Sequence, residues 1–243
     1  MVKIFTNPDS LNHFAAEKFI EIGIEAIEKC GKFTVALAGG STPTSLYQLL
    51  TAEEFRSQID WSKVFFFFGD ERNVLPDREE SNFRMAFENL FEPVQIAESQ
   101  IFRWQTELEN EYEIAADYQE KIKEFFDLKE NEFPRFDLIL LGIGDDGHTA
   151  SLFPFTEALG ETGKIAAANW VEKLQTHRLT FTFTTINNAS NVMFLARGAA
   201  KAEVLREVLE GDSQPKKLPA QNVQLKNGSL LWLLDEKAAH NLQ

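Results

Sequence analysis

The stretch "FTVALAGGSTPTSLYQLLT", residues 33 to 51, decides the fold class. Its first six residues form a continuous apolar run, which is typical of a strand covered on both faces. Two glycines follow, and "STPTSLYQLLT" then reads as a helix with a Ser or Thr cap and a proline in its first turn. The stretch therefore predicts a strand, a glycine turn and a helix in succession.

Short apolar runs recur along the chain. They are "KVFFFFG" (63–69), "FDLILLG" (136–142), "RLTFTFTTI" (178–186), "NVMFLARG" (191–198) and "SLLWLLD" (229–235). Helix-like stretches lie at 8–32, 111–128, 198–211 and 236–242, and the first has a candidate cap in Ser10 and an end near Gly31. Strands that alternate with helices predict an α/β fold, with a mainly parallel β-sheet flanked by helices.

Length and composition are those of an ordinary globular protein. We expect 243 residues to form one domain, 1–243, and the 22 phenylalanines to form a bulky core. The lone Cys30 excludes an intramolecular disulfide and a cysteine-based zinc site, which fits a reducing cytosol.

The formal net charge of the chain argues against some classes of binding partner. A formal net charge of -14 argues against nucleic-acid binding, which needs Lys and Arg against phosphates. No signal-like N-terminus and no apolar run of about 20 residues is present, so we expect no membrane partner and a cytoplasmic location, with a monomer as the default. A small anionic substrate remains compatible, because nearby cations outweigh distant, screened charge.

Two clusters of polar residues follow predicted strands. In "GGSTP" (39–43), free N–H groups at a helix start would attract a phosphate or carboxylate, although a capped turn without a ligand has the same sequence. Asp70, Glu71 and Arg72 follow the run at 63–69, where open α/β sheets bind ligands, or else they form a solvated loop.

The third cluster is "DLILLGIGDDGHTASLFP", residues 137–154. Its three glycines, Gly142, Gly144 and Gly147, match a dinucleotide-binding turn, but no β run ending in an acid lies about 20 residues on, in "GETGKIAAANW". His148 is better explained as a ligand-facing acid or base, since imidazole titrates near pH 6.5. Like residues 36–50, this stretch predicts a strand, a glycine loop and a helix whose N-terminus faces an anion.

Other chemistries have less support in the sequence. Asp145 and Asp146 suggest a metal site. The histidines other than His148, however, do not stand at the spacing of metal ligands, and no HExxH or EF-hand pattern occurs. No GxSxG elbow marks a nucleophilic serine. Arg178 and Lys201 stand at element boundaries, where phosphate contacts are common, and are otherwise ordinary exposed cations.

Taken together, the motifs resemble the 6-phosphogluconolactonase family, which shares a fold superfamily with the glucosamine-6-phosphate isomerases. The resemblance rests on "ALAGGSTP", "GDERNV" with "SNFRMAFENL", "GIGDDGHTASLFP", "RLTFTFTTINNA", "GAAKAEVL", "LPA" (218–220) and "WLLDEKAA", in that order over nearly the whole chain.

The resemblance implies an α/β domain with a mainly parallel sheet, and a hydrolase, a lactonase that opens 6-phosphogluconolactone in the pentose phosphate pathway without a metal or organic cofactor. It implies His148 as general base and Asp70 as a second catalytic residue. The implied substrate-binding residues are Gly39, Gly40, Ser41, Thr42, Arg72, Asp146, Gly147, Arg178 and Lys201.

Two competing functions are a hexosamine-phosphate isomerase/deaminase and a non-catalytic sugar-phosphate sensor. The sister isomerases typically carry an acidic residue shortly after the Asn-Gly-His of this block, and here Asp146-Gly147-His148 is followed by "TASLFP" instead. A sensor of this type usually carries a DNA-binding segment, for which 243 residues leave no room.

Overall fold

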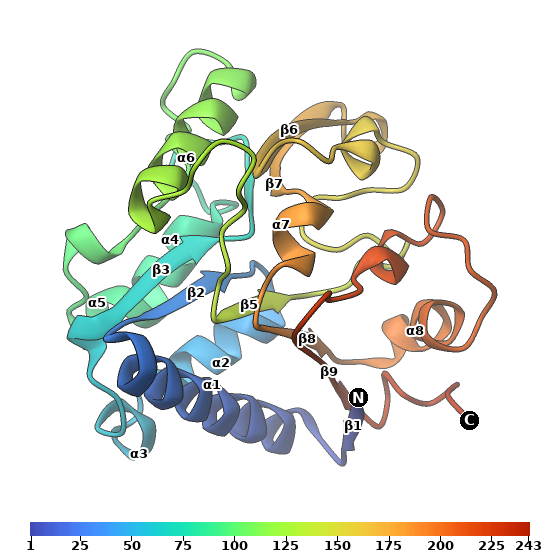
Figure 1. Ribbon diagram of the computed structural model, residues 1–243. Coiled ribbons are helices and arrows are strands. Elements are labelled where there is room, and N and C mark those ends of the chain that lie inside the picture. The colour runs from blue at the N-terminus through green and yellow to red at the C-terminus, as the bar shows by residue number, and fades with distance from the viewer.

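The computed structural model describes residues 1–243, which form two β-sheets with helices around them (Figure 1). The larger sheet has six parallel strands in the order β1-β9-β8-β5-β2-β3, and the smaller has three antiparallel strands in the order β4-β7-β6.

The strands are β1 (Val2–Phe5), β2 (Phe33–Leu37), β3 (Val64–Phe68), β4 (Asp70–Arg72), β5 (Leu138–Leu141), β6 (Ala166–Val171), β7 (Thr176–Phe181), β8 (Asn191–Ala196) and β9 (Ser229–Asp235). The α-helices are α1 (Pro8–Cys30), α2 (Ser41–Thr51), α3 (Glu53–Arg56), α4 (Asn82–Ala86), α5 (Glu92–Val94), α6 (Glu111–Phe126), α7 (Phe183–Asn187) and α8 (Ala202–Leu209). Shorter 3-10 turns are η1 (Trp61–Lys63), η3 (Glu98–Gln100), η4 (Glu157–Gly160), η5 (Glu172–Leu174), η6 (Ala199–Lys201) and η7 (Pro219–Asn222), and the π-helical turn η2 (Phe87–Phe91) joins α4 to α5.

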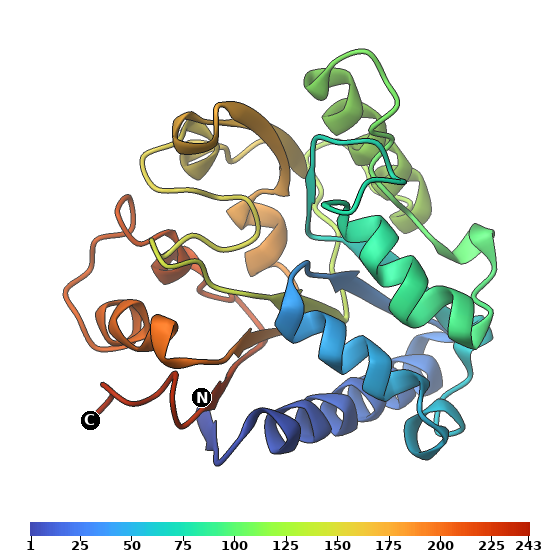
Figure 2. The same ribbon diagram turned by 180° about the vertical axis from the view of Figure 1, so that it is seen from behind.

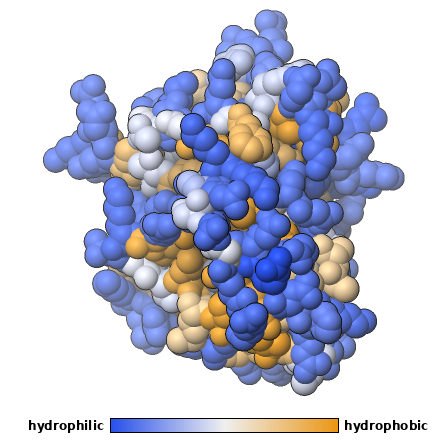
Figure 3. Space-filling view, turned by 90° about the vertical axis from the view of Figure 1, so that its right-hand side faces the viewer, coloured by the Kyte–Doolittle hydropathy of each residue, from blue (hydrophilic) through white to orange (hydrophobic).

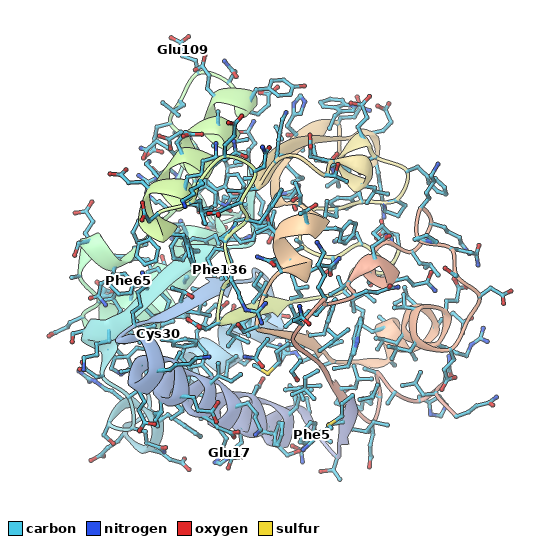
Figure 4. All side chains as sticks on the ribbon, viewed as in Figure 1. Phe5, Glu17, Cys30, Phe65, Glu109 and Phe136 are labelled. Atoms are coloured by element: carbon cyan, nitrogen blue, oxygen red, sulfur yellow. The ribbon has the colours of Figure 1, made fainter.

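Helices cover both faces of the parallel sheet, which explains its continuous apolar runs. Every residue of β2 and β5 is buried, and Figures 1 and 2 show α1 and α2 below the sheet and α6 above it. Neighbouring residues of β3 point to opposite faces. Phe66 packs on Phe91, whereas Phe67 packs on Phe125 of α6 and on Phe136, which is labelled in Figure 4. The predicted α/β fold with a mainly parallel sheet is confirmed.

The first helix differs from its prediction at one end. α1 starts at Pro8, and the Asn7 side chain caps it by accepting the Ser10 backbone N–H at 2.9 Å, so the prediction of Ser10 as cap is wrong. Asn and Ser are equally good caps, and Pro8 suits the first helical position, which places the start three residues earlier. Gly31 ends the helix as predicted, with φ at +75°.

The run at 178–186 is not one strand. β7 ends at Phe181, and the Thr182 hydroxyl then caps α7 by accepting the Thr185 N–H at 3.4 Å. β7 pairs with β4 and β6 in the smaller sheet. Thr favours both strands and helix caps, so the apolar-and-threonine pattern did not separate the two elements.

Two predicted helices are absent. Residues 236–242 form turns, and residues 149–155, after His148, form turns with a bridge between Thr149 and Leu152. Only the first glycine loop leads into a helix, α2. The expectation that a helix N-terminus faces an anion twice is therefore wrong for the second loop.

The connections reverse direction between β2 and β5. From β2 the chain continues to β3 on one side, and from β5 it continues to β8 on the other. Open α/β sheets bind ligands at such a switch point, outside the carboxyl ends of the strands. The loops that start at Ala38 and Gly142 both leave the sheet at this point.

The outer surface is largely polar. Hydrophilic residues cover most of the face in Figure 3, in keeping with a formal net charge of -14. None of the helices is both long and apolar enough to cross a membrane.

Candidate active site

A cavity of about 370 Å³ lies at the switch point, at the carboxyl ends of β2 and β5. Its charged lining consists of four cations, Arg72, Lys173, Arg178 and Lys201, and one carboxylate, Asp70. The other lining residues are Ala38, Gly39, Gly69, Leu140, Leu141, Gly142, Ile143, Gly144, His148, Ala150, Ser151, Phe153 and Leu174. A strongly acidic protein thus contains a locally cationic cavity, which suits an anionic ligand.

Glycines shape the loop that carries His148. Gly147 has φ at +79°, in the left-handed region that favours glycine, and a Cβ there would lie 2.8 Å from the Leu218 side chain. A Cβ on Gly144 would lie 2.0 Å from the imidazole of His148, whereas one on Gly142 would meet nothing within 4 Å. The glycine pattern that resembles a dinucleotide turn therefore makes room for a histidine.

His148 is oriented by a carboxylate and an aromatic ring. Its Nδ1 lies 2.5 Å from Asp146 Oδ1, and its ring stacks on Phe153 with centroids 4.0 Å apart. An ionised carboxylate only accepts hydrogen bonds, so Nδ1 carries the hydrogen and Nε2 is left with a free lone pair. Partial burial works to raise the pKa of Asp146, but the hydrogen bond and charge of His148, with a further bond from Lys173, hold it well below its ordinary value. His148 can therefore accept a proton at Nε2 while Asp146 stays charged.

Two arginines stand side by side on the wall of the cavity. Arg72 of β4 is the register partner of Arg178 of β7, and both line the cavity. Burial and the charge of Arg72 lower the pKa of Arg178, and the buried Nε of Arg178 has no hydrogen-bond partner. Like charges directly opposite each other destabilise a strand pair, so this arrangement favours binding of an anion.

Asp70 and Asn82 join the smaller sheet to the first glycine loop. Asp70 Oδ2 accepts the Ser151 hydroxyl at 2.8 Å, and the Asn82 amide donates to the Asp70 carbonyl at 2.9 Å. A Cβ on Gly39 would lie only 1.9 Å from Asn82 Oδ1, so Gly39 is the residue that lets Asn82 approach.

Glu71 points away from the cavity, because successive strand residues face opposite sides. Its buried carboxylate accepts backbone N–H groups of Arg72 at 2.8 Å and of Asn82 at 2.7 Å. Burial raises the pKa of Glu71 to about 7, against the opposing effect of these N–H groups. Of the three charged residues predicted after β3, Asp70 and Arg72 line the cavity and Glu71 fixes the start of α4.

The "GGST" loop contributes less of the cavity wall than predicted. Gly39 lines the cavity, whereas Gly40, Ser41 and Thr42 do not. Gly40, with φ at +103°, is the N-cap of α2, and no side chain caps the helix, so neither Ser41 nor Thr42 has the capping role expected of it. The Ser41 carbonyl instead accepts a bond from Arg197 at 3.1 Å.

Asp145 and Asp146 each bind a lysine from a different wall. Lys201, at the end of η6, pairs with Asp145, and Lys173, in η5, lies 3.1 Å from Asp146 Oδ2. Of the predicted substrate-binding residues in this region, Lys201 lines the cavity, whereas Asp146 and Gly147 lie outside its wall.

The sequence prediction missed Lys173, Leu174 and Ser151 among the cavity residues. Lys173 and Leu174 lie at the tip of the β6–β7 hairpin, and β6, with three alanines, carries little strand signal.

Comparison with known proteins gives consistent matches. Residues 6–232 match the family described as glucosamine-6-phosphate isomerases/6-phosphogluconolactonase. A protein of Synechocystis sp. named 6-phosphogluconolactonase is 41% identical over 219 residues, which cover 90% of this chain and 88% of the relative. Another so named, from Chlamydia pneumoniae, is 34% identical and covers 95% of this chain and 86% of its own length. The solved structure of 6-phosphogluconolactonase from Trypanosoma brucei is similar with a TM-score of 0.88 and 29% identity, over 100% of this chain and 98% of the other. The solved structure of 6-phosphogluconolactonase from Thermotoga maritima has a TM-score of 0.82 and 30% identity, and the match covers 97% of this chain and 99% of the other.

Proposed function

The chain belongs to the family of glucosamine-6-phosphate isomerases and 6-phosphogluconolactonases, and from that premise we propose that it hydrolyses 6-phospho-D-glucono-1,5-lactone to 6-phosphogluconate. This reaction is a step of the pentose phosphate pathway, and we propose that it proceeds by general-base activation of water. It is an enzyme of the lactonase type, a carboxylic ester hydrolase. The observation that carries the proposed mechanism is the His148–Asp146 pair at 2.5 Å beside a cavity with four cationic side chains.

His148 acts as the base in this proposal. Nε2 takes a proton from water while the water oxygen bonds to the lactone carbonyl carbon and the carbonyl electron pair moves to its oxygen. When the tetrahedral intermediate collapses, the bond to the ring oxygen breaks and Nε2 returns the proton to that oxygen. General-base catalysis of this kind supplies about 10²- to 10⁴-fold in rate. Asp146 holds the imidazole tautomer that the step requires.

The cations divide into two proposed roles. Arg178 and Lys201 bind the phosphate, which carries up to two negative charges near neutral pH. Either Arg72 or backbone N–H groups of the glycine loop stabilise the oxyanion. Asp70, the one carboxylate on the wall, accepts a hydrogen bond from a sugar hydroxyl.

The cavity supports hydrolysis over isomerisation. Isomerisation needs a base for a carbon-bound proton. The only carboxylate on the cavity wall is Asp70, which accepts a hydrogen bond from Ser151, and Asp146, the carboxylate bound to His148, lies outside that wall. Lactone hydrolysis needs only an activated water and support for the oxyanion.

The test is an assay of acid release from freshly made 6-phosphogluconolactone at neutral pH, corrected for its spontaneous hydrolysis. We expect saturable turnover by the wild type, and equal turnover by His240→Ala, which changes an exposed histidine outside the cavity. Binding of the phosphosugar without turnover above the spontaneous rate would contradict the proposed function.

A further inference from the structure

The tip of the β6–β7 hairpin brings a lysine to the proposed base from a distant part of the chain. η5 forms this tip, and Gln175 closes it with φ at +51°. Lys173 and Leu174 from the tip line the cavity beside His148. The proposed reaction so far assigns Lys173 no role.

Lys173 and His148 share the carboxylate of Asp146. The ammonium group lies 3.1 Å from Oδ2, while His148 Nδ1 lies 2.5 Å from Oδ1. The Asp146 side chain is 25% exposed and that of His148 is 27% exposed, so both groups are mostly withdrawn from water. Each oxygen of Asp146 thus has a side-chain donor, and the carboxylate is held from both sides.

The Asp146 carboxylate and the Lys173 ammonium group have opposite effects on protonation of the His148 ring. A nearby carboxylate favours the protonated ring, and a nearby ammonium group disfavours it. A protonated imidazole cannot accept the proton of water, so the pull of the carboxylate alone works against the proposed base. A cation on the far oxygen of Asp146 offsets that tendency.

We propose that Lys173 is a positioning residue for His148: it holds Asp146 in place from the hairpin and limits the proton affinity that this carboxylate confers on the imidazole. The role in turnover rests on the proposed lactonase reaction. The effect on His148 itself does not depend on that reaction.

Other charges also face His148 across the cavity. They are Asp70, Arg72, Arg178 and Lys201, with Asp145 bound to Lys201. These groups are unchanged in a Lys173 variant, so the difference between variant and wild type reports on Lys173 alone.

The exposure of Lys173 separates this role from one in stability. Its side chain is 69% exposed, and ion pairs of exposed groups contribute little to stability. We expect loss of Lys173 to leave the unfolding temperature unchanged while it alters the titration of His148.

The experiment is an NMR titration of the histidine ring signals in the wild-type protein without substrate and in Lys173→Gln and Lys173→Arg. The chain has four histidines, and a His148→Gln variant assigns the signal. In Lys173→Gln we expect the midpoint of His148 to rise by about 0.5 pH units, a threefold gain in proton affinity, and this rise to shrink in 0.5 M salt. Lys173→Arg should restore the wild-type midpoint. Lys164→Gln, a change of an exposed lysine paired with Glu161 outside the cavity, should leave it unchanged.

Kinetics give the second measurement. In Lys173→Gln the acid limb of the kcat/KM profile should move up by the same amount as the NMR midpoint. An unchanged His148 midpoint would overturn the proposal, as would a rise in KM with an unchanged pH profile, which would make Lys173 a substrate-binding cation. If the wild type does not hydrolyse the lactone, the proposed function fails, and the NMR result still decides whether Lys173 acts on His148.

Discussion

Asp145 and Asp146 are neighbours in one loop, and each binds a lysine from a different wall of the same cavity. The Asp145 side chain is 72% exposed and pairs with Lys201, whereas the Asp146 side chain is 25% exposed and binds His148 as well as Lys173. The same residue type with the same type of partner therefore serves different purposes in this loop. Burial and a second partner make Asp146 part of the proposed proton-transfer machinery, whereas Asp145 is an exposed carboxylate with one ion-pair partner, Lys201.

Asparagine substitutions test this difference most strongly. We expect Asp146→Asn to lower kcat for the lactone by about 100-fold, because the neutral amide no longer fixes the imidazole tautomer. Asp145→Asn should change kcat by less than about threefold, as for an exposed ion pair. Steady-state kinetics at neutral pH measure both, and equal losses in the two variants would erase the distinction.

Removal of a wall cation should act on binding instead of on the chemical step. Arg178→Met is expected to raise KM by about 30-fold with a smaller change in kcat, since the phosphate charge is the same in substrate and transition state. Arg56→Met, a change of an exposed arginine on α3, is the control. A fall in kcat at constant KM would assign Arg178 to the oxyanion.

The glycines of the same loop offer a steric comparison. Gly144→Ala places a Cβ 2.0 Å from the His148 ring, and we expect a loss of about 1–3 kcal/mol in the free energy of unfolding, with reduced turnover. Gly142→Ala meets no atom within 4 Å and should cost less than about 0.5 kcal/mol. Denaturant unfolding measures both variants, and equal costs would show that His148 does not lie against Gly144.

The smallest expected effect is on acid stability. The pKa of Asp146 is lower in the folded protein than in the unfolded chain, so its contribution to stability is present above the unfolded pKa and is lost as the pH falls through the folded one. Asp146→Asn should therefore reduce the slope of unfolding free energy against pH, below about pH 4, by up to about 1.4 kcal/mol per pH unit. Denaturant unfolding at several pH values measures this slope, and a wild-type slope in Asp146→Asn would contradict the expectation.

Much of the fold was predictable from local patterns, because a short, continuous apolar run such as 136–142 is typical of a strand covered on both faces. The errors lie where one residue type suits two structures. Thr182 directly follows the last residue of β7 and caps α7, within a single run of threonines and phenylalanines. The alanines of β6 become a strand only because β7 pairs with them.

The candidate site was predictable in part for the same reason. His148 and Arg72 were found because they follow predicted strands, and both line the cavity. Arg178 also lines it, but the prediction that it stands at an element boundary is wrong, because β7 begins at Thr176 and Arg178 lies inside the strand. The different environments of Asp145 and Asp146 were not predictable, since they depend on the left-handed turn at Gly147 and on lysines from elsewhere in the chain.

Turnover of 6-phosphogluconolactone by His148→Ala at neutral pH, with and without added imidazole, tests whether His148 is the general base. We predict a fall in kcat of about 10²- to 10⁴-fold and partial recovery with imidazole, which can take the proton in place of the missing side chain. Turnover close to that of the wild type without imidazole would contradict the account.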